Sequence, residues 1–126
     1  MISSCPVHTA VPVADLDKAI AWYEGTLGFP AGQRFSGGVF YQAGDGTRFQ
    51  LYPSGNAGKN PATLMGFVTS DIEADVRDLK ARGVVFEEYE SGDFKTVDSI
   101  ASVEGARAAW FKDPDGNLLS FLQLPG

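Results

Sequence analysis

Hydrophobic and polar residues follow the same order in both halves of the chain. In the first half, an apolar segment spans Val7–Val13, Asp15 follows as a helix N-cap, and apolar residues recur at helical spacing before Gly28. In the second half, Asp71 and Gly83 enclose the same spacing. Glycine readily adopts the left-handed conformation that ends a helix, so the pattern predicts two helices, each preceded by a strand. Their apolar stripes consist of Leu16, Ile20, Tyr23 and Leu27 in the first helix and Ile72, Val76 and Leu79 in the second.

Each half ends in strands joined by a tight turn. Val39–Ala43 and Arg48–Pro53 flank Gly44-Asp45-Gly46, whose glycines accept the positive φ that such turns require. The second half closes on Leu119-Ser120-Phe121 after the turn Asp113–Gly116. Proline at the second turn position and an aspartate that accepts from turn amides explain this turn as structure rather than catalysis.

Three further positions modify the strand and helix assignment. Pro12 cannot donate a ladder hydrogen bond, which predicts that the first strand lies at a sheet edge or has an unpaired amide there. Ser70 and Glu73 have the spacing of a capping box. The second half is longer than the first, and the extra residues fall in Tyr89–Gly105, which has weak periodicity. This segment predicts a long loop, acting as a lid or binding loop or forming an inert surface excursion.

Charge and composition restrict the partners of the chain. Its formal net charge of -6 at pH 7 opposes binding to nucleic acid and to anionic membranes. No apolar run approaches the ~20 residues that cross a bilayer, and the first residues lack a secretory signal. The single cysteine, Cys5, excludes an internal disulfide and is expected in a cytoplasmic protein.

Two segments are distinctive as whole motifs. Residues 11–29 read VPVADLDKAIAWYEGTLGF, and residues 109–121 read AWFKDPDGNLLSF. Together they resemble the vicinal oxygen chelate superfamily, which includes glyoxalase I, extradiol dioxygenases and bleomycin-resistance proteins. The resemblance covers nearly the whole chain. It implies an α+β fold of two βαβββ modules, at about residues 1–56 and 57–126 of one domain, whose curved mixed sheets enclose a cavity, usually in a homodimer.

The resemblance also implies four positions at which relatives that use a metal hold their ligands. In this chain they carry His8, Gln50, Met65 and Ser120, with the register at Met65 open by one residue. A thioether and a neutral hydroxyl are poor ligands for nickel, zinc, iron(II) or manganese. We therefore expect no metal and no other cofactor. The alternative is a divalent metal held by His8 and Gln50 and completed by water or substrate.

Side chains two positions apart on a strand face the same way, which extends these four positions into a cavity wall. Leu118 and Leu122 then accompany Ser120, and aromatic residues on neighbouring strands join the wall or belong to the core. Such a lining suits a flat, partly hydrophobic ligand. The expected ligand contacts are Phe40, Arg48, Gln50, Tyr52, Met65, Phe67, Trp110 and Ser120.

The main functional hypothesis is metal-independent binding of a small organic molecule, by which the protein would sequester a toxic or antibiotic compound. One alternative is a metal-dependent lyase, isomerase or dioxygenase. Another is an enzyme without metal, in which His8 acts as the catalytic general base and Arg48 or Tyr52 stabilises negative charge. His8 also has a purely structural interpretation, because no acidic partner for it is identifiable in the sequence.

Overall fold

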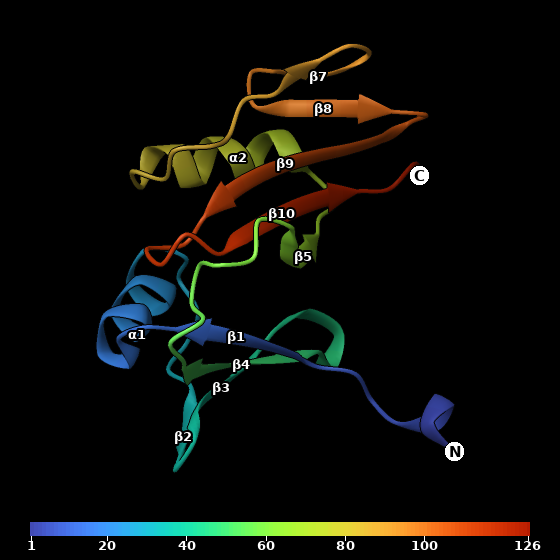
Figure 1. The fold of residues 1–126 in the computed structure, drawn as a ribbon. Helices are drawn as coiled ribbons and strands as arrows, with labels where there is room; N and C mark the ends of the chain where they lie inside the picture. Colours follow the sequence, from blue (N-terminus) through green and yellow to red (C-terminus); the bar gives the residue numbers. More distant parts are fainter.

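Two mixed β-sheets, each with one α-helix packed on one side, make up the computed structural model, which describes residues 1–126 (Figure 1). In the first sheet the strand order is β1-β4-β3-β2, with β1 and β4 parallel and the other pairs antiparallel. Its strands are β1 (Thr9–Val13), β2 (Gln33–Phe35), β3 (Gly38–Gln42) and β4 (Arg48–Pro53). β1 lies at the sheet edge, as Pro12 predicts. The short helix η2 (Gly44–Gly46) forms the turn between β3 and β4.

The second sheet repeats this plan and extends it. Its order is β5-β10-β9-β8-β7-β6, with β5 and β10 parallel and the other pairs antiparallel. Its strands are β5 (Thr63–Val68), β6 (Glu90–Ser91), β7 (Phe94–Val97), β8 (Ile100–Val103), β9 (Ala106–Lys112) and β10 (Leu118–Gln123). The edge strands β1 and β5 contact each other where the two sheets meet. The predicted α+β fold of two βαβββ-like modules is confirmed.

Both long helices begin at the predicted aspartates. The helices are η1 (Ile2–Ser4), α1 (Leu16–Gly25) and α2 (Ile72–Ala81). The carboxylates of Asp15 and Asp71 each accept from the backbone N–H three residues later, as N-caps do. The predicted capping box of Ser70 and Glu73 is wrong, because Asp71 caps α2 and Glu73 forms an ion pair with Arg107 at 2.7 Å. Neither α-helix has the length and apolar content needed to cross a bilayer.

The core lies between the sheets and their helices and is continuous across both modules. A cluster of 18 buried residues includes Tyr23, Leu51 and Phe111, each 0% exposed. Aromatic rings connect the two halves, since the ring of Phe67 lies 6.3 Å from that of Phe49 in the first sheet. Each fully buried side chain of this size stabilises the fold by roughly 1.5–3 kcal/mol. Neither module therefore buries its apolar surface alone.

The prediction of a long loop at Tyr89–Gly105 is wrong. This segment forms β6, β7 and β8, which add a hairpin to the second sheet. Asp98 and Ser99 make the two-residue turn between β7 and β8 with φ values of 52° and 74°. The Glu88 carboxylate fixes this turn by accepting from Ser99 Oγ at 2.7 Å and from Thr96 Oγ1 at 2.6 Å.

The turn before β10 joins the two modules by hydrogen bonds. Tyr23 Oη on α1 donates to Asp113 Oδ2 at 2.8 Å, and Asn117 Nδ2 donates to the same oxygen at 2.9 Å. Asn117 Nδ2 also donates to the Pro12 carbonyl at 2.7 Å, while its Oδ1 accepts from the Gly58 N–H at 3.0 Å. Asp113 and Asn117 are buried. The structural interpretation of this turn is therefore confirmed. Its hydrogen bonds join the end of the second module to β1, to α1 and to the segment between the modules.

Candidate ligand-binding site

The first sheet has one face that α1 does not cover. Gln50 pairs with Ala10 on β1 and with Phe40 on β3, so these side chains share that face. Gln50 Nε2 donates to His8 Nε2 at 3.0 Å, and the His8 ring lies 5.7 Å from the Phe40 ring. The Arg48 guanidinium sits 4.5 Å above the same ring, in cation–π geometry. Four residues predicted for the site therefore lie together.

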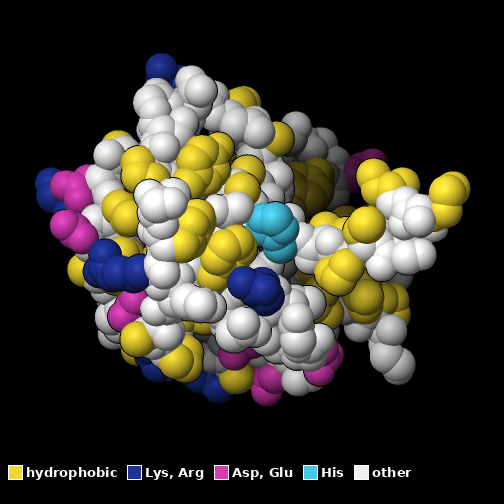
Figure 2. Space-filling model, turned by 90° about the horizontal axis from the view of Figure 1, so that it is seen from below, with side chains coloured by type: hydrophobic (Ala, Val, Ile, Leu, Met, Phe, Trp, Pro, Cys, Tyr) yellow, Lys and Arg dark blue, Asp and Glu magenta, His cyan; other side chains and the backbone are white.

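This group lies on an open face beside the seam between the sheets. Figure 2 shows the single histidine on the surface of the molecule, beside hydrophobic side chains and a Lys or Arg side chain. Tyr52 is half-buried and pairs with Pro12 on the same helix-free face. A cavity of about 480 Å³ follows the seam between the start of β1, the β3–β4 turn and β5. The predicted residues that line this cavity are His8, Arg48, Met65 and Phe67.

The second sheet carries an aromatic cluster that the sequence revealed only in part. The Trp110 ring lies 5.5 Å from the Tyr89 ring and 5.6 Å from the Phe94 ring, and these two rings are 6.0 Å apart. Trp110 Nε1 donates to Thr63 Oγ1 at 3.2 Å, which fixes the indole. Burial, together with the nearby charge of Glu87, raises the pKa of Tyr89. Tyr89 and Phe94 escaped prediction because their segment lacked a clear strand pattern.

The structure corrects the expected positions of two residues on β5. Ser120 pairs with Trp110 and with Gly66, so the helix-free face of β5 carries Gly66 rather than Met65. Met65 is 7% exposed and belongs to the core, and Phe67 packs against the same core. A Cβ atom at Gly66 would lie 2.8 Å from Ser120 Oγ, which shows how closely these two positions face each other. Met65 and Phe67 therefore reach the seam cavity from the helix side and do not share the face of Ser120.

The donor atoms of one chain do not fit a divalent metal. His8 Nε2 lies 3.0 Å from Gln50 Nε2, so the only two suitable ligand side chains of the first sheet contact each other. Across the second sheet, Gly66 has no side chain and Ser120 supplies only a neutral hydroxyl that is 8% exposed. No group of three or more His, Cys, Asp or Glu side chains is close enough together to hold an ion. A catalytic metal generally needs three good protein ligands.

The hydrogen bonding of His8 also argues against a role as general base. A catalytic histidine is usually oriented by a carboxylate or a carbonyl group on its second ring nitrogen. His8 is exposed, and its only hydrogen-bond partner is the Gln50 amide. The geometry therefore favours recognition of a ligand by aromatic faces, a guanidinium and an amide.

The fold and these helix-free faces define a class of protein. The chain belongs to the Glyoxalase/Bleomycin resistance protein/Dioxygenase superfamily, whose family model matches residues 6–121. This confirms the resemblance seen in the sequence.

Solved structures of this class are similar over almost the whole chain. TnmS3, an antibiotic binding protein from Streptomyces sp. CB03234, is 28% identical with a TM-score of 0.71, over 100% of this chain and 99% of that one. A glyoxalase/bleomycin resistance protein from the same organism is 27% identical with a TM-score of 0.67, over 93% and 98%. One from Catenulispora acidiphila DSM 44928 is 23% identical with a TM-score of 0.66, over 97% and 100%, and shows the fold alone. No curated protein matches the chain significantly.

Proposed function

We propose that this protein binds a small, flat organic molecule on the helix-free faces of its sheets, without a metal ion, and so sequesters a toxic or antibiotic compound. The observation that carries the proposal is that the helix-free faces hold two aromatic surfaces, while the nearby nitrogen and oxygen atoms do not fit a metal ion. One surface is Trp110 with Tyr89 and Phe94, and the other is Phe40 beneath Arg48. The similarity to an antibiotic binding protein at 28% identity supports it.

The chemistry of the two surfaces indicates the kind of ligand. Aromatic pairs contribute roughly 0.5–1.5 kcal/mol beyond the burial of their area, so stacking on Trp110 or Phe40 supplies much of the affinity. The Arg48 guanidinium and the Gln50 amide offer a few directed hydrogen bonds. The net charge of -6 favours a cationic compound over an anionic one at long range.

Two copies of the chain would complete the site. Several hydrophobic side chains on the helix-free faces are exposed, including Val68 at 73%, Phe35 at 42% and Phe94 at 37%. We take these exposed apolar groups as part of the surface that meets a partner copy, since contiguous apolar patches mark interaction sites. In a homodimer with two-fold symmetry, the first sheet of one copy would face the second sheet of its partner, and each dimer would hold two equal sites. The free thiol of Cys5 suits a reducing compartment such as the cytoplasm.

A fluorescence titration tests the ligand proposal. The variant Trp22→Phe leaves Trp110 as the only tryptophan, because the chain has two. Bleomycin and the planar cation proflavine should quench its emission, and calorimetry should show affinity unchanged by a chelator. Trp110→Ala should weaken binding about tenfold, since a stacked aromatic anchor carries roughly 1.4 kcal/mol or more.

Three results would contradict the proposed site: unaltered emission with both compounds, equal affinity in Trp110→Ala, or stoichiometric metal whose removal abolishes an activity.

Light scattering tests the dimer separately. The parent chain should have twice the mass of one copy, and Val68→Lys should reduce it to a single copy. A parent chain that stays monomeric would remove the two-copy arrangement but leave the ligand proposal to the titration.

A further inference from the structure

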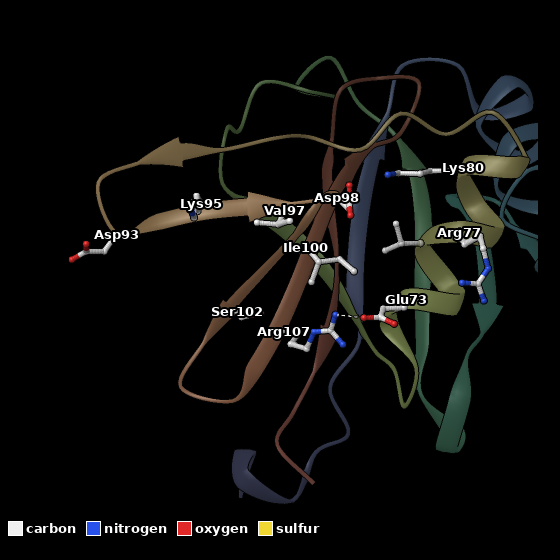
Figure 3. A pocket seen from close by; sticks show the side chains of 11 residues that line it. Glu73, Arg77, Lys80, Asp93, Lys95, Val97, Asp98, Ile100, Ser102 and Arg107 are labelled. Atoms are coloured by element: carbon white, nitrogen blue, oxygen red, sulfur yellow. Dashed lines mark hydrogen bonds and ion pairs between the residues drawn. The ribbon is translucent and has the colours of Figure 1, made fainter.

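A larger hollow lies on the opposite side of the second sheet, where neither aromatic surface reaches. It is a cleft of about 790 Å³ between α2 and the β7–β8 hairpin (Figure 3). Its apolar floor consists of Val76 from α2 and of Val97 and Ile100 from the hairpin. Val97 remains 64% exposed although it belongs to this floor. The volume is within the roughly 300–1,000 Å³ typical of small-molecule sites.

Basic side chains gather around this floor in an otherwise acidic protein. The cleft is lined by Arg77, Lys80, Lys95 and Arg107, which are four of the ten Lys and Arg residues of the chain. Arg107 is neutralised by Glu73 at 2.7 Å, whereas Arg77, Lys80 and Lys95 form no ion pair. Figure 3 shows Lys80 reaching from α2 toward the hairpin. Lys80 and Lys95 therefore line the apolar floor without an ion pair, whereas the guanidinium of Arg77 points away from the floor in Figure 3.

The acidic residues that line the cleft cancel part of this charge. Asp93 lies in the turn between β6 and β7 and points away from the cleft (Figure 3). Glu73 is already paired with Arg107. Asp98 in the β7–β8 turn is the remaining carboxylate that lines the cleft. The nearby Glu88 also attracts Lys80, since side-chain hydrogen bonds and the charge of Lys80 together lower the pKa of Glu88. An anion therefore gains most beside Lys80, on the helix side of the cleft, with Lys95 across from it on β7.

The walls of the cleft are fixed by hydrogen bonds. The Glu73–Arg107 ion pair connects α2 to β9 at one end, as the dashed line in Figure 3 shows. At the hairpin, Glu88 accepts from Thr96 and Ser99, and these hydrogen bonds hold the pKa of its carboxyl below the ordinary value. A ligand would therefore meet a preformed site and pay little to order it.

We propose that this cleft is a second binding site, for a small organic anion that carries an apolar group, such as an aryl phosphate. The apolar group would cover Val97 and Ile100, and the anionic group would lie between Lys80 and Lys95. The site faces α2, so it is separate from the aromatic surfaces and does not depend on the function proposed for them. The site would also give a role to β7, a strand that the first module lacks and whose other face carries Phe94.

Amide NMR spectra with naphthyl phosphate as the probe test this proposal. Shifts should concentrate in α2 and the β7–β8 hairpin, and naphthol and inorganic phosphate should bind much more weakly, because each offers only half of the contacts. Lys80→Gln should weaken binding about fivefold, equivalent to the upper range for an exposed ion pair. Lys18→Gln, which removes a charge from the other helix, should leave it unchanged.

Several outcomes would overturn the second site. These are an absence of shifts in the cleft at millimolar probe, equal binding of naphthol, equal binding of inorganic phosphate, or an affinity unaffected by Lys80→Gln. Shifts that map to Trp110 instead would assign the probe to the aromatic surface. Unchanged cleft binding in Trp110→Ala would show that the two sites are separate, whereas lost cleft binding in this variant would contradict their separation.

Discussion

Replacing Asp113 by alanine removes the acceptor that joins the two modules. Its carboxylate accepts from Tyr23 Oη at 2.8 Å, from Asn117 Nδ2 at 2.9 Å, and from the turn amides of residues 115 and 117 at 2.9 and 3.0 Å. A buried donor that loses a charged partner costs roughly 1.5–3 kcal/mol. Tyr23 is 0% and Asn117 3% exposed, so neither donor can turn to water. These two side chains alone predict a loss of about 4 kcal/mol in the free energy of unfolding.

Urea unfolding followed by circular dichroism measures this loss. A domain of this size is typically stable by about 5–15 kcal/mol, so the change should move the midpoint strongly. Asp93→Ala, which removes an exposed carboxylate without a hydrogen bond, should stay within about 0.5 kcal/mol of the parent. A double-mutant cycle with Tyr23→Phe should show a coupling of about 1–2 kcal/mol. A loss below about 1 kcal/mol in Asp113→Ala would refute the account of a buried acceptor shared by both modules.

Two further predictions concern the segment between β4 and β5, which contains Gly58, and the loss of stability at high pH. Gly58 has φ +70°, and a Cβ atom there would overlap the carbonyl oxygen of Asp115. Gly58→Ala should therefore lower the free energy of unfolding in urea by at least about 2 kcal/mol. Gly55→Ala should be neutral, because no atom lies within 4 Å of a Cβ atom there, and equal losses in the two variants would contradict this reasoning. Burial, reinforced by the charge of Asp113, raises the pKa of Tyr23 above its ordinary value of 10.0. The folded protein then keeps a proton that the unfolded chain releases, so stability is complete below about pH 10 and is lost as the pH rises further. Tyr23→Phe should flatten this alkaline loss in unfolding experiments at increasing pH, and an unchanged slope would argue against it.

The local signals in the sequence predicted most of the fold. Asp15 and Asp71 cap their helices as expected, because an N-cap depends only on residues a few positions away. The β7–β8 hairpin was missed, since its turn uses Asp98 and Ser99 at positive φ, where glycine or asparagine is the usual signal. Here the Glu88 carboxylate stabilises the turn by accepting hydrogen bonds from the backbone N–H and the hydroxyl of Ser99.

The site was only partly predictable, because it depends on register. The resemblance placed His8 and Gln50 at neighbouring positions, and the structure brings them into contact. Met65 was assigned to the wrong face, since a register shift between β5 and the start of β10 moves Gly66 opposite Ser120. A one-residue difference reverses the face of a side chain, and periodicity alone does not fix it. The bond between Tyr23 and Asp113 joins residues 90 positions apart and has no local signal.

The tie between Asn117 and the connecting segment has a consequence for how the chain assembles. Proteins with two similar halves can trade halves between molecules when the connection swings open. Here Gly58, midway along that connection, donates to Asn117 Oδ1 in the other half. An exchange would have to release this anchor before any replacement contact formed, which raises the barrier to swapping. The hydrogen bond from Gly58 thus favours packing of the two halves of one chain against each other during folding. Association between folded molecules would then use only exposed surfaces outside the core.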